Sequence, residues 1–277
     1  IIAGAGILKS KSSDDLREFA RKNNIPVTTT LLGLGTFPSD DVLALGMLGM
    51  HGAVAANYAT GEADLIIAAG IRFDDRITGN PKTFCANAKI IHIDIDPAEI
   101  EKNIKIDLPI VGDLKNVLEK FNESIDGLEH KQWLEQIKRW KEEYPFRYGE
   151  SKEGRLMPQE VLESLNKIIQ GKSIVATDVG QNQMWAAQYL SFTRPNTILT
   201  SGGSGTMGFG IPAAIGAQIA QPQEKVVCIV GDGGFQMTYQ ELILMKQYNL
   251  PVKIVVLNNS YLGMVRQWQE MFNDGRY

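Results

Sequence analysis

The chain has 277 residues, of which 44% are hydrophobic and 22% are charged, and its formal net charge is −4. The length suits about two domains, and the composition is typical of globular domains with buried cores. Its acidic balance and the lack of a basic cluster argue against a nucleic-acid partner. No apolar run reaches the ~18 residues of a membrane span. We therefore expect a cytoplasmic protein without nucleic-acid or membrane partners, and we expect its two cysteines, Cys85 and Cys228, to be reduced and buried.

The two ends of the sequence lack the features of chain termini. The chain begins in an apolar run, Ile1-Ile2-Ala3-Gly4, that predicts a strand already under way, and it stops at Tyr277 without a closing element. We expect an internal piece of a longer protein, truncated at both ends.

Short apolar runs alternate with helical patterns along the first half. This pattern predicts strands at 1–4, 27–30, 65–69 and 90–95, and helices at 12–23 and 53–60. Runs of Ile, Val and Leu separated by helices are typical of a parallel sheet buried on both faces. Residues 114–144 are polar and helical, with Trp133 and Trp140 as aromatic anchors, and indicate solvated linker helices.

The composition shifts near residues 151–158, and a second α/β series follows. It predicts strands at 173–177, 197–200, 225–230 and 252–257, and helices at 159–169, 182–189, 212–220 and 235–248. The fold class is therefore α/β, with two doubly wound parallel-sheet domains. We expect a central domain at 1–125, a helical linker at 126–152, and a second domain at 153–277 that is incomplete at its C-terminus.

One strand end carries the pattern of a phosphate site. The strand at 225–230 leads into Gly231-Asp232-Gly233-Gly234, and a helix is predicted to begin at Phe235. Glycines let the backbone approach a phosphate closely, and the N-terminus of the helix favours an anion. The carboxylate of Asp232 would repel that anion unless a cation lay between them. The pattern therefore predicts a metal ion at Asp232.

Asn258 and Asn259 follow the next strand along the chain. A right-handed βαβ unit ends both strands at one edge of the sheet, where open α/β sheets bind ligands. Asp232 and Asn259 offer the oxygen ligands that Mg²⁺ prefers, and the lack of histidine in either segment argues against zinc. No GxxxxGK[ST] motif occurs, so a P-loop is excluded. The strand–GDG–helix–strand–NN order is that of the thiamine diphosphate motif.

Longer stretches resemble one enzyme family. Ser201–Gly210 (SGGSGTMGFG), Gly231–Gly233 (GDG) and Asn258–Gln269 (NNSYLGMVRQWQ) resemble the large, catalytic subunit of acetolactate synthase (acetohydroxyacid synthase), a thiamine diphosphate-dependent enzyme. Met47–Gly52 (MLGMHG) and Arg72–Gly79 (RFDDRITG) resemble its FAD-binding middle domain. The resemblance covers essentially the whole chain. It is specific, because RFDDR and GMVRQWQ are not shared by thiamine enzymes generally.

The resemblance implies a set of site residues. The Mg²⁺ ligands would be Asp232, Asn259 and the backbone carbonyl of Tyr261. The thiamine diphosphate contacts would be Gly180, Gln181, Asn182, Gly205, Met207, Gly231, Gly233 and Gly234. Met264 would also touch the aminopyrimidine, and Trp268 would shape the pocket for the second substrate. The FAD contacts would be Gly4, Gly6, Met50, His51, Arg72, Asp75, Arg76, Asp94 and Asp113. Asn182 stands where the family usually has His, and Ser204 where it usually has Leu.

The residues alone leave several of these assignments open. Gly4-Ala5-Gly6 lacks the third glycine of GxGxxG, which favours a tight strand–helix turn over a Rossmann NAD site. His51 suits a capping or packing role as well as a flavin contact. The segment 72–76 could be a surface ion-pair cluster, and Trp268 could be ordinary core. His92 lies mid-strand and is predicted to be a buried core histidine.

The resemblance also implies an activity. Two pyruvates would be joined to 2-acetolactate with release of CO₂, or pyruvate and 2-ketobutyrate to 2-aceto-2-hydroxybutyrate, in the first common step of branched-chain amino acid biosynthesis. FAD would have no net redox role. The enzyme would be a homodimer or homotetramer assembled through the thiamine site, with a small regulatory subunit as a further partner.

Thiamine activation in the family needs a glutamate on a separate N-terminal domain of a neighbouring subunit. No residue of this sequence matches it, so we expect the chain alone to be inactive. The alternatives are a pyruvate oxidase or another thiamine-dependent 2-keto acid decarboxylase and, from a different class, a non-catalytic nucleotide-binding module.

Overall fold

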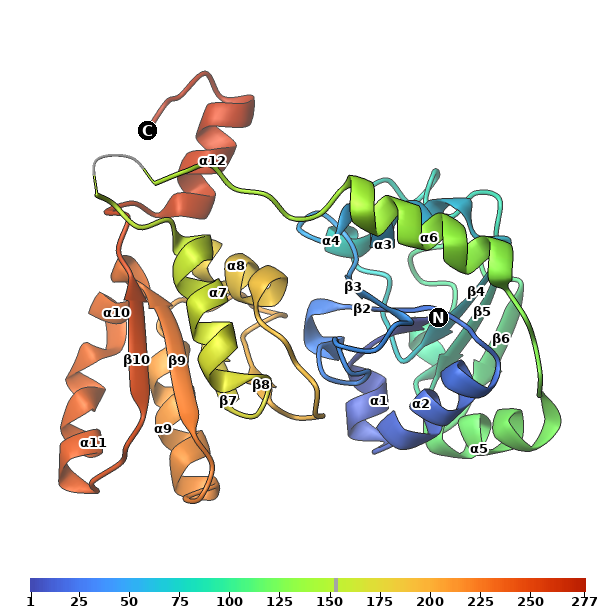
Figure 1. Cartoon of the computed structure of the whole chain (residues 1–277), viewed down its shortest axis with the longest axis horizontal. Helices are drawn as coiled ribbons and strands as arrows, with labels where there is room; N and C mark the ends of the chain where they lie inside the picture. The colour runs from blue at the N-terminus through green and yellow to red at the C-terminus, as the bar shows by residue number, and fades with distance from the viewer. Residues whose placement is uncertain (152–153) are drawn as a thin grey trace. The chain divides into compact units, whose positions relative to one another are not determined.

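The computed structural model describes residues 1–151 and 154–277, which form two compact units (Figure 1). The first unit comprises Ile1–Arg147 with Thr193–Pro195, and the second comprises Tyr148–Phe192 with Asn196–Tyr277. Each unit contains its own parallel sheet with helices packed against it. The predicted fold class, two α/β parallel-sheet domains, is confirmed. The boundary predicted between residues 152 and 153 lies outside the described residues.

The sheet of the first unit has six parallel strands in the order β3-β2-β1-β4-β5-β6. These strands are β1 (Ile2–Ala3), β2 (Val27–Thr29), β3 (Ala44–Met47), β4 (Leu65–Ala69), β5 (Lys89–Asp94) and β6 (Leu108–Val111). The chain winds outward from the centre in both directions, so the topological switch point lies between β1 and β4. The four strands predicted in the first half are confirmed as β1, β2, β4 and β5. The edge strands β3 and β6 were not predicted, because each is short and is interrupted by Gly46 or Pro109.

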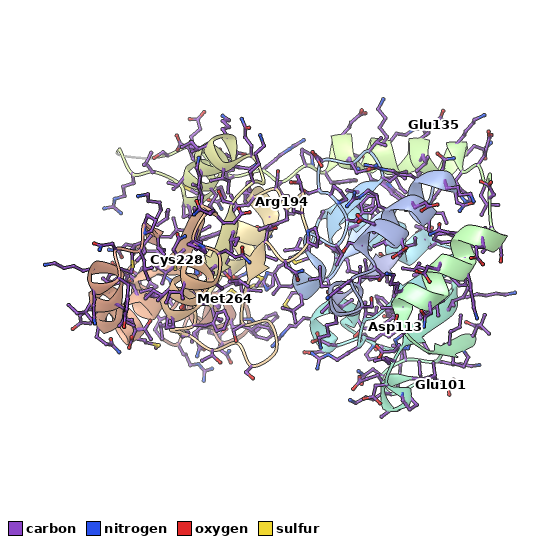
Figure 2. All side chains as sticks on the ribbon, turned by 90° about the horizontal axis from the view of Figure 1, so that it is seen from below. Glu101, Asp113, Glu135, Arg194, Cys228 and Met264 are labelled. Carbon is purple, nitrogen blue, oxygen red and sulfur yellow. The ribbon has the colours of Figure 1, made fainter. Side chains whose placement is uncertain are left out.

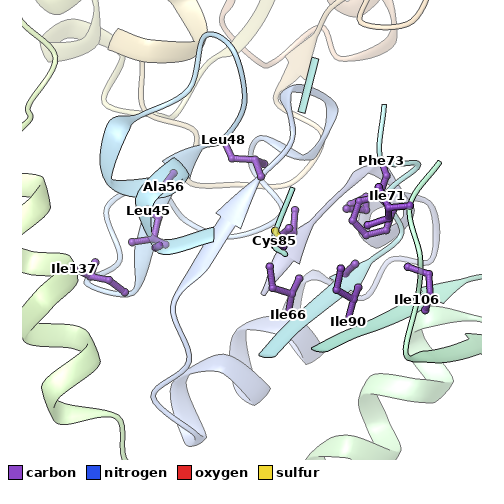
Figure 3. Packing of buried hydrophobic residues seen from close by; sticks show 14 residues of the cluster. Leu45, Leu48, Ala56, Ile66, Ile71, Phe73, Cys85, Ile90, Ile106 and Ile137 are labelled. Carbon is purple, nitrogen blue, oxygen red and sulfur yellow. The ribbon is translucent and has the colours of Figure 1, made fainter. Parts of the chain in front are cut away.

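Helices cover both faces of this sheet. They are α1 (Ala5–Lys9), α2 (Ser13–Lys22), α3 (Val54–Glu62), α4 (Asp75–Thr78), α5 (Leu114–Ser124) and α6 (Lys131–Glu143), with 3₁₀ turns η1 (Leu31–Gly33) and η2 (Pro97–Glu99). One face buries Phe19 of α2 and Leu118 of α5. The other face, drawn in Figure 3, buries Ile66 and Ile90 beside Phe73. The core therefore lies in two layers, one on each side of the sheet.

Helix α6 belongs to the second of these layers. Ile137 is buried in that cluster, and the indole rings of Trp133 and Trp140 pack against it. These three residues recur at the spacing that places side chains on one face of a helix. The two indoles also meet edge to face, with ring centroids 5.6 Å apart. This predicted linker segment is thus packed onto the first unit through one apolar stripe.

The sheet of the second unit has four parallel strands in the order β10-β9-β7-β8. These are β7 (Ile174–Thr177), β8 (Ile198–Leu199), β9 (Val226–Gly231) and β10 (Lys253–Leu257). Its helices are α7 (Pro158–Ile169), α8 (Gln181–Tyr189), α9 (Gly210–Ala220), α10 (Asp232–Thr238), α11 (Leu242–Gln247) and α12 (Gly263–Phe272), with the 3₁₀ turn η3 (Tyr239–Glu241). Five consecutive buried apolar residues form the body of β9, which explains its central place in the sheet.

The helix predicted at 235–248 differs from the structure. Helix α10 already begins at Asp232, and the segment is broken into α10, η3 and α11, so the prediction of one helix starting at Phe235 is wrong. The break falls at Thr238, whose backbone (φ −138°, ψ 17°) leaves the helical region. The Thr238 hydroxyl donates to the carbonyl of Gly208, 3.1 Å away. A tertiary contact therefore interrupts a helix that the local pattern would continue.

Both cysteines are free and buried, as predicted. Burial raises the pKa of the Cys85 and Cys228 thiols to about 12, so at neutral pH almost no reactive thiolate is present. We expect both thiols to react with a disulfide reagent only as fast as their unit opens, and rapidly in denaturant. The absorbance of the thiol that the reagent releases measures the reaction, and circular dichroism of the same sample shows whether the protein is still folded. Native-state reaction at the rate of a free cysteine would contradict it.

Within the described residues, no helix combines the length and the apolar character needed to cross a bilayer.

Candidate cofactor and metal site

Strands β9 and β10 bring the two predicted metal-binding segments to one edge of the second sheet. The strands are parallel, and Gly231 pairs with Leu257 at their carboxyl ends. Asp232 follows Gly231 directly, and Asn259 lies two residues after Leu257. The prediction that both strands end at the same edge is confirmed.

The diphosphate segment is the start of helix α10. Gly231 is its N-cap, with extended backbone (φ −79°, ψ 161°), and Asp232 lies in the first turn. The first N–H groups of a helix have no intrahelical partner and face outward. A Cβ on Gly233 would lie 3.0 Å from Leu262 Cδ2 and 3.4 Å from Met207 Cε. Met207 and Leu262 therefore approach the helix start, where a larger residue at 233 would be crowded.

Gln181 joins the segment that follows β10. Asn259 Nδ2 donates to Gln181 Oε1, 3.2 Å away, and Asn259 Oδ1 accepts from the backbone N–H of Tyr261 at 3.0 Å. Ser260, between them, has a left-handed backbone (φ 60°), which makes the turn tight. The predicted ligands Asn259 and Tyr261 thus share one turn that contacts the start of α8.

Asn182 is buried between β7 and β9. Its Nδ2 donates to the carbonyls of Asp178, at 3.0 Å, and of Ile229, at 3.3 Å. A Cβ on Gly180 would lie 2.8 Å from Asn182 Oδ1, and a Cβ on Gly231 would lie 3.4 Å from the same oxygen. Both amide hydrogens are thereby used inside the fold. A contact between Asn182 and a diphosphate stays a prediction.

Asp178 was not singled out in the sequence, although it is fully buried at the centre of this site. Its Oδ1 accepts from the backbone N–H of Val179 at 2.9 Å and of Gly208 at 3.1 Å, and its Oδ2 accepts from Gly210 at 2.8 Å. A Cβ on Gly234 would come within 2.2 Å of Oδ1. The available signal was an acidic residue directly after the apolar run 173–177, at the ligand-binding edge of the sheet.

The glycine-rich loop, residues 201–210, has an exposed tip and a buried base. Residues 203–206 are exposed, whereas Gly208 and Gly210 are buried. Gly205 lies in the tip with a left-handed backbone (φ 60°), and a Cβ there would approach Val179 at 4.0 Å. The loop therefore runs beside the segment that leads from β7 into α8.

Helix α12 carries the predicted substrate residues. Met264 and Trp268 lie on it, and Trp268 is 42% exposed with its ring centroid 4.9 Å from that of Phe272. The alternative that Trp268 is ordinary core does not fit this exposure. Arg266 pairs with Glu270 at 2.8 Å and stacks over the ring of Tyr261, 3.9 Å from its centroid. The hydroxyl of Tyr277 and then Arg266 lower the pKa of Glu270.

In the first unit, the predicted FAD residues lie at the carboxyl edge of the sheet. Gly4 and Gly6 follow β1, and Asp94 ends β5. Asp113 follows β6 and caps α5, where its Oδ1 accepts from Lys115 N–H at 2.9 Å; Figure 2 labels it beside that helix. A Cβ on Gly4 would come within 2.2 Å of the carbonyl oxygen of Gly70. The ends of β1 and β4 therefore touch through bare backbone at the switch point.

The remaining FAD candidates surround helix α4. The N–H of Met50 donates to the carbonyl of Arg76 at 2.9 Å, which joins the segment after β3 to this helix. Arg76 and Asp75 lie 3.8 Å apart with side chains 62% and 78% exposed, so this ion pair contributes little to stability. Burial, and then the charge of Arg76, lower the pKa of His51.

Arg72, an FAD candidate, and His92, a predicted core histidine, both lie beside Ile71. The carbonyl of Arg72 accepts from Asn103 Nδ2 at 2.9 Å. His92 is fully buried, its Nε2 lies 2.9 Å from the carbonyl oxygen of Ile71, and its ring meets that of Phe73 edge to face. The prediction of a core histidine is confirmed.

The donor set around Asp232 restricts the metal. In residues 1–151 and 154–277, no group of three or more His, Cys, Asp and Glu side chains could hold an ion. Asp232 with an amide and a carbonyl oxygen offers a single carboxylate. Such a set suits Mg²⁺, which completes its octahedron with phosphate oxygens and water.

Comparison with known proteins places the chain. Residues 1–121 match the family model of the thiamine pyrophosphate enzyme central domain, and residues 178–277 match that of the C-terminal TPP binding domain. The chain is 50% identical over 277 residues to the acetolactate synthase large subunit of Lactococcus lactis, covering all of this chain and 48% of the relative. It is 45% identical over 284 residues to the acetolactate synthase isozyme 3 large subunit of Escherichia coli, covering all of this chain and 49% of that subunit. It is 49% identical over 267 residues to the chloroplastic acetolactate synthase 1 of Zea mays, covering 94% of this chain and 42% of that protein.

The chain spans about half the length of the curated relatives it matches. Both family models describe parts of one kind of enzyme, and together they match most of the sequence. The similarity to the large subunits extends over the whole chain and includes both units of the structure. The chain therefore belongs to the thiamine pyrophosphate enzyme family, in the group of the acetolactate synthase large subunits.

Proposed function

We propose that the protein to which this chain belongs joins two pyruvates to 2-acetolactate with release of CO₂, and pyruvate with 2-ketobutyrate to 2-aceto-2-hydroxybutyrate. The observation that carries the proposal is the meeting of Asp232 and Asn259 at one sheet edge, beside a glycine-rich helix start. The relatives named acetolactate synthase support the same activity.

The residues present fit thiamine diphosphate with Mg²⁺. Asp232, the Asn259 amide and the Tyr261 carbonyl would hold the metal, and the backbone of Gly233 and Gly234 would receive the diphosphate. A side chain at 233 would be crowded by Leu262 and Met207, so the glycine there keeps the backbone accessible. When bound, the cofactor supplies the carbon nucleophile that the reaction with a 2-keto acid needs.

Other side chains of the second unit would orient the bound groups. Gly180, Gln181, Asn182, Gly205 and Gly231 would line the cofactor. Met207 and Met264 would contact the aminopyrimidine. Trp268 has a large exposed ring on α12, which suits a wall of the pocket for the second 2-keto acid.

We propose FAD as a further cofactor, without a net redox role. Its candidate residues gather at the carboxyl edge of a doubly wound sheet, where such sheets bind ligands. The close packing of Gly4 against Gly70 leaves no room for a side chain at Gly4, so the ends of β1 and β4 lie close together at this edge.

Domain limits, assembly and location are further proposals. The domains would be 1–125 and 153–277, joined by a helical linker at 126–152. The protein would form a homodimer or homotetramer through the thiamine site, bind a small regulatory subunit, and reside in the cytoplasm. One of the relatives is chloroplastic, so location can differ within the group.

The test is a product assay of the full-length enzyme with pyruvate, thiamine diphosphate, Mg²⁺ and FAD. We expect acetolactate and CO₂ as the products. Hydrogen peroxide would instead indicate a pyruvate oxidase, and free aldehyde would indicate a non-oxidative decarboxylase. Failure to bind thiamine diphosphate, measured by calorimetry in the presence of Mg²⁺, would indicate a non-catalytic nucleotide-binding module.

A further inference from the structure

Asp178 connects three segments that carry expected cofactor contacts. It follows β7 directly, and Gly180 and Gln181 lie two and three residues after it. Its two oxygens accept the N–H groups of Gly208 and Gly210 at the base of the glycine-rich loop. Its carboxylate also packs against the backbone of Gly234, in the first turn of α10. A single buried residue is thus in contact with the start of α8, through its carbonyl and Asn182, and with the loop and the start of α10 through its carboxylate.

The loop needs such a restraint. Five of the ten residues at 201–210 are glycine, and glycine has the largest conformational freedom to lose on ordering. At the exposed tip, the N–H of Thr206 donates to Ser201 Oγ, 3.0 Å away. Two further ties hold the base, the carboxylate of Asp178 on one side and the hydroxyl of Thr238 on the other, which donates to Gly208. Restraining a loop before it meets its ligand lowers the entropy cost of binding.

We propose that Asp178 is a positioning residue of the thiamine diphosphate site, and this inference rests on the proposed function. Its carboxylate holds the base of the glycine-rich loop against α10, so that Gly205 and Met207 face the cofactor in a preset arrangement. Asp178 itself does not touch the cofactor in this scheme. It acts through the backbone N–H groups of Gly208 and Gly210.

Position 178 needs a carboxylate because of the number of N–H groups that donate to it. Asp178 accepts from three backbone N–H groups through two oxygens. An asparagine of the same shape has one accepting oxygen, and its NH₂ group would face an N–H donor. Asp178→Asn therefore keeps the packing against Gly234 and leaves at least one buried N–H of the loop base without an acceptor.

The experiment measures the affinity of the full-length enzyme for thiamine diphosphate by calorimetry at saturating Mg²⁺. Leaving a buried donor unpaired is expected to raise the Kd of Asp178→Asn about tenfold, with kcat at saturating cofactor retained. Amide hydrogen exchange in residues 201–210 is expected to become faster in the cofactor-free variant. The milder Thr238→Val, which removes the other tie, is expected to raise the Kd about threefold.

The matched control is Gln218→Leu. Gln218 is equally buried in the same unit, but its amide donates to the carbonyls of Gln221 and Glu224 at the far end of α9. We expect this variant to lose stability without losing affinity for the cofactor. An unchanged Kd in Asp178→Asn, or an equal loss in Gln218→Leu, overturns the proposal.

Two further outcomes remain decisive. If Asp178→Asn does not fold, Thr238→Val decides, since an unchanged Kd there also overturns the role of the loop base. If the wild-type enzyme fails to bind thiamine diphosphate, the proposed function fails and the role of Asp178 falls with it, whereas an unchanged Kd in Asp178→Asn overturns the role of Asp178 alone.

Discussion

Asp232→Ala in the full-length enzyme is expected to weaken Mg²⁺-dependent binding of thiamine diphosphate by more than about 100-fold and to abolish product formation. Loss of a residue that only orients a metal ligand costs about 10- to 100-fold, and loss of the single carboxylate ligand removes more. Asp232 begins the helix that would receive the diphosphate. Its negative carboxylate and the negative diphosphate would repel each other unless a metal cation lay between them. Calorimetry with and without Mg²⁺ measures the effect.

The matched control for this experiment is Asp274→Ala. Asp274 is an exposed carboxylate in the same unit and pairs only loosely with Arg276, at 3.4 Å. We expect this variant to bind the cofactor as the wild type does. If Asp232→Ala retained Mg²⁺-dependent binding, the two strand tips would not be the metal site.

The sequence predicted the interior of both sheets well. Runs such as Val226–Val230 are apolar on both faces and tolerate no environment other than a central parallel strand. The edge strands β3 and β6 were missed, because one face of an edge strand can be polar and their glycine or proline weakens the pattern. The division of the helix at Thr238 could not be read locally, since its cause is a hydroxyl bonded to Gly208, thirty residues away.

The sequence was enough to place segments that each follow a strand at one edge of the sheet, and it was not enough to find contacts made between distant segments. Asp232 and Asn259 each follow an apolar strand, so the right-handed crossover rule was enough to bring them to one edge. Asp178 follows a strand in the same way, but nothing near it in sequence reveals that its carboxylate accepts from the backbone N–H groups of Gly208 and Gly210. The contact of Asn182 with a diphosphate stays a prediction, and the sequence did not reveal that its Nδ2 donates to the carbonyls of Asp178 and Ile229.

Gly6→Ala is expected to lower the stability of the first unit by about 1–3 kcal/mol, as overpacking of a tight core site does. A Cβ at this position would lie 2.6 Å from the Cα of Gly70 and 3.0 Å from Leu114 Cδ1. The first of these atoms is backbone and cannot rotate away, so the ends of β1 and β4 must part. That is the switch point of the sheet, where we propose that FAD binds, so the purified full-length variant is also expected to contain less flavin.

Gly61→Ala separates this steric effect from the loss of a glycine as such. Gly61 lies near the end of α3, and a Cβ there would meet nothing within 4 Å. Because alanine favours a helix over glycine, the Gly61→Ala variant should have unchanged stability or be more stable by up to about 1 kcal/mol. It should also contain as much flavin as the wild type. Thermal unfolding and flavin absorbance of both variants make the comparison. Equal stability and equal flavin in Gly6→Ala and Gly61→Ala would mean that the approach of β1 to β4 does not shape the flavin site.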